Sequence, residues 1–157
     1  MTETPRPSNF THGPDVLTLL NRDLANEMQT MLMYMSGGLL VRGADSLDIR
    51  EVAEDFAKQD FTHARKLASR IVELDGVPQL QPQQIVDNAS IDMKRPHDGQ
   101  AKPLLKNALE NELQSVLEYR NQIQNIAFTD PATRLLLEGI LADKERQVEQ
   151  IRHLIGV

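Results

Sequence analysis

The sequence of 157 residues contains no cysteine and no tryptophan. The absence of cysteine excludes disulfide bonds and thiolate metal sites, and it is compatible with a reducing compartment. Aromatic residues make up 4% of the chain, as two tyrosines and four phenylalanines. An excess of basic charge is also missing, since 17 Lys and Arg stand against 23 Asp and Glu, for a net charge of −6. We therefore predict no nucleic-acid partner, because nucleic-acid binding usually needs a basic surface.

Long hydrophobic runs are missing as well. The most apolar stretch, MLMYMSGGLLV at residues 31–41, is shorter than the roughly 20 residues that a membrane-spanning helix needs. The first 13 residues are polar and rich in proline, without the charged-then-apolar order of a signal peptide. We predict a cytoplasmic protein without a membrane partner, with a flexible segment over 1–13 and a single domain over 14–157.

Helical periodicity dominates the rest of the chain. Apolar residues recur at intervals of three and four over about 15–42, 46–76, 103–128 and 131–154. This spacing is typical of helices that pack side by side in a bundle. Residues 77–101 hold three prolines and no sustained period, so we predict a long connection there.

The lengths of the connections predict the topology. Short loops pair the first two helices, and the last two, as antiparallel hairpins. The long connection can extend to about 80 Å at about 3.3 Å per residue, whereas a helix of nearly 30 residues is about 45 Å long. The connection can therefore run the length of the bundle. We predict an all-α four-helix bundle, with two antiparallel hairpins joined by a crossover at 77–101 and no fifth helix.

Each apolar stripe is interrupted near its middle by polar or ionisable residues. In chain order, these are Glu27, then Asp60 and His63, then Glu112, and finally Lys144 and Gln147. Asp60 and His63 are three residues apart, which directs a carboxylate and an imidazole to the same side of a helix. Carboxylate oxygens together with an imidazole nitrogen are suitable ligands for iron, manganese or zinc. The pattern therefore predicts a polar layer across the bundle that is a candidate metal site.

The segments around these residues resemble the bacterioferritin branch of the ferritin-like superfamily. The resemblance extends from about Leu17 to Leu154 and is carried by LANEMQTMLMY, DFTHARKLASRIVELDGVPQL, NELQSVLEYR and LLLEGILADKERQVEQI. It implies a ferritin-like bundle that binds iron. By this resemblance the metal ligands are Glu27, His63 and Glu112, with Asp60 in place of a bridging glutamate. Tyr34 matches the tyrosine beside the iron centre, where it is a candidate catalytic residue.

Three features depart from the family pattern. The expected Glu-x-x-His of the last helix reads Lys144-Glu145-Arg146-Gln147, so Lys144 and Gln147 replace the second half of the site. An ungapped alternative would place Glu145 at the glutamate and Val148 at the histidine. Phe61 stands where the family has its haem-ligating methionine, so we predict that no haem binds. The chain ends in HLIGV, soon after the last helix, without the family's short fifth helix.

The charges of the layer limit the number of metal ions. Glu27, Asp60 and Glu112 contribute −3 and Lys144 contributes +1, which leaves −2. One divalent ion balances this charge, and two would overcharge a buried site, where unpaired charge is costly. We therefore predict one iron ion or none per subunit, with Lys144 bridging to Glu112 or Asp60 as a fixed cation.

Two functions follow from this layer. The first is an iron-binding ferritin-like protein for iron storage or detoxification, with weak or impaired oxidation of Fe(II) by O₂ or peroxide. The alternative is a metal-free, non-catalytic bacterioferritin-like structural subunit in which Lys144 replaces the metal. In either case the resemblance implies a homodimer through the first two helices or a larger shell of 12 or 24 subunits. Co-assembly with a complete bacterioferritin subunit is a further possibility for the partner.

Overall fold

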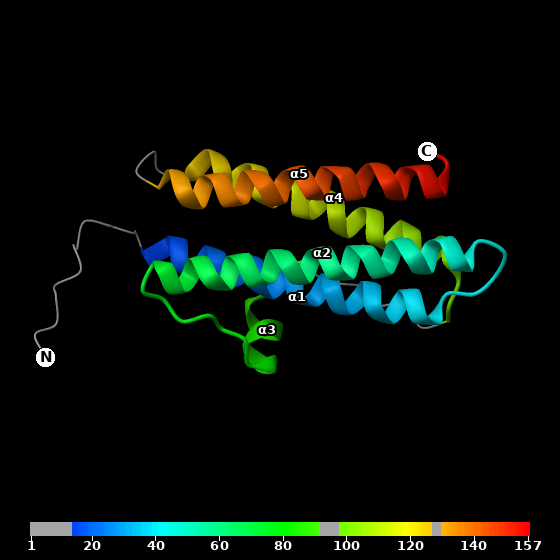
Figure 1. Ribbon diagram of the computed structural model, residues 1–157, viewed down its shortest axis with the longest axis horizontal. Helices are drawn as coiled ribbons and strands as arrows, with labels where there is room; N and C mark the ends of the chain where they lie inside the picture. Colours follow the sequence, from blue (N-terminus) through cyan, green and yellow to red (C-terminus); the bar gives the residue numbers. More distant parts are fainter. Residues whose placement is uncertain (1–13, 92–97, 127–129) are drawn as a thin grey trace, which may run out of the picture.

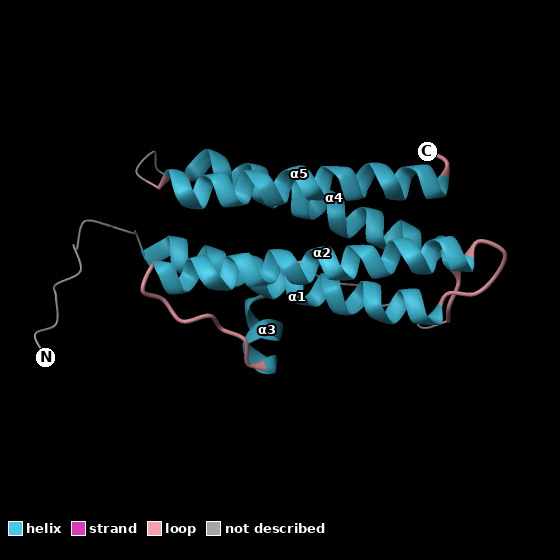
Figure 2. Cartoon of the chain, in the orientation of Figure 1, coloured by secondary structure: helices cyan, strands magenta, loops and turns pink. Residues whose placement is uncertain are grey.

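The computed structural model describes residues 14–91, 98–126 and 130–157, so the predicted flexible segment 1–13 lies outside the described residues. The described part of the chain is almost entirely helical (Figure 2). Its helices are α1 (Pro14–Leu40), α2 (Ser46–Glu73), α3 (Pro82–Asn88), α4 (Ala101–Asn125) and α5 (Pro131–Ile155). No helix among these residues is long and apolar enough to cross a membrane.

The four long helices form two antiparallel hairpins. α1 lies beside α2, α4 lies beside α5, and all four share one long axis (Figure 1). The chain leaves α2 at one end of the bundle and enters α4 at the other, and α3, which lies between them in sequence, packs on α1 (Figure 1). The side chain of Asn26 on α1 holds this connection: its Oδ1 accepts hydrogen bonds from the backbone N–H groups of Ser90 (2.9 Å) and Ile91 (3.2 Å).

The prediction of four helices and no fifth was wrong, because the described residues contain five. The additional helix is α3, which lies within the connection and packs on α1. Pro82 is its first residue, where a missing N–H is harmless, and Gln84 Oε1 accepts from the backbone N–H of Gln81 at 3.2 Å. The helix is seven residues long and buries no side chain, so it leaves no apolar period in the sequence. Pro82 is one of the three prolines from which we predicted an irregular connection, but proline at the first position of a helix does not break it.

Local sequence explains the bounds of α5. The side chain of Asp130 accepts a hydrogen bond from the backbone N–H of Thr133 at 3.1 Å, and Pro131 follows as the first helical residue. At the other end Gly156 has φ +86°, a left-handed conformation that glycine adopts without strain. Arg70 of α2 also donates hydrogen bonds to Asp130 Oδ1 and Thr133 Oγ1, both at 2.8 Å, which ties the start of α5 to α2.

The apolar core is divided along the bundle axis. One group of buried side chains fills the end nearest the start of α1, and the rest fill the middle and the opposite end. The first group comprises Leu20, Leu24, Ala64, Leu67, Ile71, Leu74, Tyr119, Leu137 and Ile140. The next comprises Met33, Tyr34, Ala53, Phe56, Ala108 and Ile151. The six polar residues predicted from the sequence lie on turns of the four long helices between these two groups.

Candidate metal centre

The four long helices bring all six predicted polar side chains to one level of the bundle. Glu27 comes from α1, Asp60 and His63 from α2, Glu112 from α4, and Lys144 with Gln147 from α5. Each of the six is at most 2% exposed. Their helical register explains the convergence, since each lies on the same stripe as the core residues one turn away. We call this set the polar layer.

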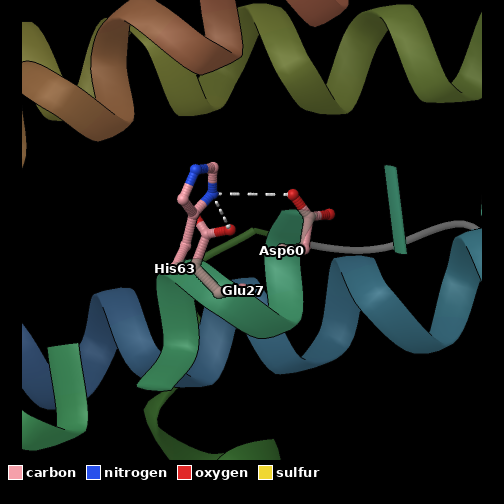
Figure 3. A group of neighbouring side chains, drawn as sticks. All are labelled: Glu27, Asp60 and His63. Carbon is pink, nitrogen blue, oxygen red and sulfur yellow. Dashed lines mark hydrogen bonds and ion pairs between the residues drawn. The ribbon is translucent and has the colours of Figure 1, made fainter. Parts of the chain in front are cut away.

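His63 lies at the centre of the candidate metal ligands. Its Nδ1 is 3.2 Å from Glu27 Oε2 and 3.8 Å from Asp60 Oδ1. Figure 3 shows the imidazole and the two carboxylates turned toward one another. One ligand atom from each of the three residues lies within 4.8 Å of the others. Donors at such separations can share one ion with metal–ligand bonds of about 2.0–2.2 Å.

Asp143 orients the imidazole from the other side. Its Oδ2 is 2.8 Å from His63 Nε2, and its other oxygen, Oδ1, contacts Arg146. An imidazole that donates Nε2–H to Asp143 keeps the lone pair of Nδ1 for a cation, whereas an imidazolium donates to Asp143 and Glu27 together. A carboxylate behind a metal-binding histidine fixes its tautomer and ring orientation. Asp143 was not among the predicted site residues because it lies one residue off the stripe. Its position next to Lys144 in the sequence was the one sign that it lies near the layer.

Lys144 enters the layer more deeply than predicted. Its Nζ is 2.8 Å from Asp60 Oδ1, 3.1 Å from Glu27 Oε2 and 3.4 Å from Glu112 Oε2. We predicted a bridge to Asp60 or Glu112, and the ammonium contacts both and Glu27 as well. Its ammonium therefore lies among three carboxylates, donates a hydrogen bond to Asp60 Oδ1, and occupies the space between Asp60 and Glu112.

Two buried tyrosines fix the remaining carboxylate oxygens. Tyr34 donates its hydroxyl to Glu112 Oε1 at 2.6 Å, and Tyr119 donates to Glu27 Oε1 at 2.7 Å. Tyr34 thus touches the layer through Glu112. Tyr119 lies seven residues after Glu112, on the same stripe of α4, and was not among the predicted site residues. These are the two tyrosines of the chain, which has no tryptophan.

Gln147 and Phe61, the two remaining positions singled out in the sequence, differ in burial. Gln147 donates from Nε2 to Asp60 Oδ1 at 3.2 Å and to Gln59 Oε1 at 2.9 Å. Phe61 is 47% exposed on the outer side of α2, next to Met31 and Met35 of α1 around a cavity of about 560 Å³. The layer itself therefore does not include the position that the resemblance connects with haem.

Burial and the ammonium separate the pKa values of the three carboxyl groups. For Glu27, burial opposes ionisation, but Lys144 and His63 outweigh it and lower the pKa to about 2. For Asp60, burial dominates over Lys144 and raises the pKa to about 8. Burial likewise raises the pKa of Glu112. Burial alone would lower the pKa of Lys144, but the three carboxylates raise it well above its usual range. One ammonium is thus too little charge to keep all three carboxylates ionised.

The layer offers oxygen and nitrogen donors of the kind that a divalent ion binds, beside the fixed cation Lys144. Asp60 Oδ2 and Glu112 Oε2 are buried without a hydrogen-bond partner among the described residues, and buried oxygens of this kind are usually partnered. The set formed by Glu27, Asp60 and His63 has the oxygen and nitrogen donors that iron accepts. A second ion between Asp60 and Glu112 would coincide with the ammonium of Lys144.

Comparisons with known proteins decide the family. The ferritin-like domain family matches residues 17–157. The chain belongs to the ferritin-like family. A relative from Synechococcus sp., a nutrient stress-induced DNA-binding protein, is 29% identical over 139 residues, which cover 87% of this chain and 78% of the relative.

Solved structures of similar shape agree with this assignment. A dodecameric thioferritin from Bacteroides fragilis, described as bacterioferritin-related, has a TM-score of 0.87 and 27% identity, covering 90% of this chain and 84% of that one. The Dps protein from Thermosynechococcus elongatus has a TM-score of 0.85 and 21% identity, covering 90% of both chains. The ferritin-like superfamily is confirmed. Membership in the bacterioferritin branch, and the absence of a nucleic-acid partner, stay predictions.

Proposed function

We propose that this protein binds one ferrous ion per subunit at Glu27, Asp60 and His63, as an iron-storing or iron-detoxifying member of the ferritin-like family. The observation that carries the proposal is the position of His63. Its Nδ1 faces two buried carboxylate oxygens while Nε2 is held by Asp143. A histidine kept only for packing has no need of an orienting carboxylate behind it and acidic oxygens in front of it.

The charge of the layer supports one ion. With all three carboxylates ionised, Lys144 leaves two negative charges, and in a metal-free layer burial shifts the pKa of both Asp60 and Glu112 toward the protonated form. One divalent ion supplies the same compensation, so binding displaces protons. Lys144 then acts as the second cation of the layer.

Oxidation of the ion is expected to be slow. Each ferrous ion yields one electron, while reduction of one peroxide molecule to water takes two. A subunit with one ion therefore has to wait for a second ferrous ion or another electron donor. Tyr34 lies in the layer through Glu112, and it is the residue that we propose as the catalytic contributor, because its hydroxyl is hydrogen-bonded to a buried carboxylate that can accept its proton.

Intrinsic fluorescence tests the proposal directly. Both tyrosines of the chain donate to layer carboxylates, so tyrosine emission reports on the layer without a label. Anaerobic titration with Co²⁺, a paramagnetic stand-in for Fe²⁺, should quench this emission and saturate at one ion per subunit by metal analysis. The variant His63→Leu should abolish saturable quenching. The control His153→Leu, an exposed position on the same chain, should behave as the native protein.

The metal-free alternative is favoured by one observation, the three contacts that Lys144 makes with the carboxylates. It predicts no saturable quenching and a His63→Leu variant at least as stable as the native protein. Two ions per subunit would contradict both functions, because that stoichiometry requires the ammonium to leave the layer.

Assembly is the second part of the proposal. Apolar side chains on the outer faces of α1 and α2 are exposed, among them Met35, Leu39 and Phe61. We propose that a second subunit covers them in a homodimer, which can be the unit of a larger shell such as the dodecamer of the thioferritin. Phe61→Glu should shift the native assembly to smaller species in sedimentation, whereas Val72→Glu, farther along α2, should not.

A further inference from the structure

The polar layer has connections to solvent through the seam between α2 and α5. The members of the layer and both tyrosines are at most 3% exposed, so none of them reaches solvent. Two of their hydrogen-bond partners do: Asp143, whose side chain is 22% exposed, and Gln59, which is half-buried. Both lie on this one seam, Gln59 on α2 and Asp143 on α5.

An open cavity lies at the outer end of both connections. It has a volume of about 750 Å³ and is lined by Gln59 and by residues of α5 between Ala142 and His153. Gln59, on its wall, accepts from Gln147, which in turn donates to Asp60. We call this space the α5 cavity.

The second connection starts from the same cavity. Arg146, also on its wall, contacts Asp143, whose other oxygen is 2.8 Å from His63 Nε2. One surface cavity is therefore linked by two short hydrogen-bonded chains to two of the three candidate ligands, Asp60 and His63.

We propose that divalent ions reach the polar layer from the α5 cavity, and that the hydrogen-bonded pair of Gln59 and Gln147 is the shutter that closes the inner end of this route. The inference rests on the proposed function, since it concerns the path to the same site. The shutter is held by a single neutral hydrogen bond of 2.9 Å between Gln147 Nε2 and Gln59 Oε1. Side-chain rotation of the half-buried Gln59 breaks this bond without disturbing either helix.

The chemistry of the pair suits a passing cation. Gln147 Oε1 is buried and has no hydrogen-bond partner among the residues that the structure describes. Once Gln59 has rotated away, this amide oxygen can contact an ion without losing a bond, and amide oxygens are ligands of hard divalent cations. The next oxygen inward is Oδ1 of Asp60, which accepts a hydrogen bond from Nε2 of the same glutamine. Gln147 thus takes a place in ion transfer, in addition to replacing a ligand.

The rate at which Co²⁺ arrives tests the shutter. Mixing the full-length protein with Co²⁺ in a stopped-flow instrument gives the rate of tyrosine quenching, and an equilibrium titration gives the affinity. The variants Gln59→Ala and Gln59→Met both lack the acceptor, and Met keeps the length of the side chain. Both should quench roughly threefold to tenfold faster, as expected for loss of one neutral hydrogen bond. The affinity should stay within about twofold, because Gln59 is not a ligand.

A matched control lies on the same cavity wall. Gln150→Ala changes an exposed glutamine of α5 that has no contact with the layer, and its quenching rate should equal that of the native protein. Equal rates in the native protein, both Gln59 variants and the control would overturn the shutter and leave the proposed function standing. Absence of quenching in the native protein would reject the proposed function, and the shutter with it.

Discussion

Replacing Lys144 with methionine removes the ammonium of the polar layer and keeps an unbranched side chain of similar length. In the native protein the Nζ atom has carboxylate oxygens at 2.8, 3.1 and 3.4 Å, and the side chain is fully buried. Removing one partner of a buried ion pair typically lowers the free energy of unfolding by about 3–5 kcal/mol. We expect a loss of this size at neutral pH for the metal-free protein.

The size of the loss should depend on pH, with a definite sign. Burial opposes the ionisation of Glu27, but Lys144 is the strongest of the effects that lower its pKa to about 2 in the native protein. Without Lys144 this pKa rises, so folding of the variant takes up a proton at Glu27 that folding of the native protein does not. The loss therefore grows as the pH rises from about 2 toward the Glu27 pKa of the variant, by about 1.4 kcal/mol per pH unit, whereas Asp60, whose pKa burial already raises to about 8, adds to the loss only above that value. At pH 5 the variant should lie closer to the native protein than at pH 8.

Urea denaturation at pH 5 and pH 8, at one fixed protein concentration, measures this difference. Lys66→Met is the control, because Lys66 is exposed on α2 and should change the stability little. Saturating Co²⁺ should restore part of the lost stability, about 2.7 kcal/mol at a hundredfold excess over Kd. A loss below about 1 kcal/mol, or the same loss at both pH values, would refute the assignment of Lys144 as the cation that compensates the layer.

Two further predictions concern helix contacts outside the layer. Asp23 is buried with Gln122 as its hydrogen-bond partner, and burial raises its pKa well above 3.8, so ionisation destabilises the fold as the pH rises. Asp23→Asn should therefore stabilise by about 1–2 kcal/mol at pH 8 and less at pH 5 in urea denaturation. A Cβ on Gly38 would lie 2.9 Å from the Cβ of Ala53. Gly38→Ala should thus lower the melting temperature through overpacking of about 1–2 kcal/mol, whereas Gly139→Ala, with open space around it, should raise it.

The polar layer could be predicted because each of its members replaces an apolar residue on a helical stripe. The 3.6-residue period requires a core residue at each of their positions, and the structure places them together. These positions are Glu27, Asp60, Glu112, Lys144 and Gln147. The period tells which side of each helix a residue faces, and this information is enough to predict which residues meet in the layer. Its metal occupancy is a separate matter, which the fluorescence titration addresses.

The partners that orient the layer were beyond this reasoning. Asp143 and Gln59 each immediately precede a member of the layer, so they point about 100° away from the stripe and look like surface residues in sequence. Their contacts depend on how far α2 and α5 stand apart, which no single-helix pattern reports. The helix α3 was missed for the related reason that it buries nothing and has no stripe.

Lys144 has a consequence for how the protein is made. In a centre compensated only by metal, the newly synthesised chain must acquire ions before its buried carboxylates are neutralised, so folding depends on the metal supply. Here part of that compensation is encoded in the chain and arrives with α5 during synthesis. The bundle can therefore fold without metal, and under the proposed function it then waits as an empty acceptor for iron.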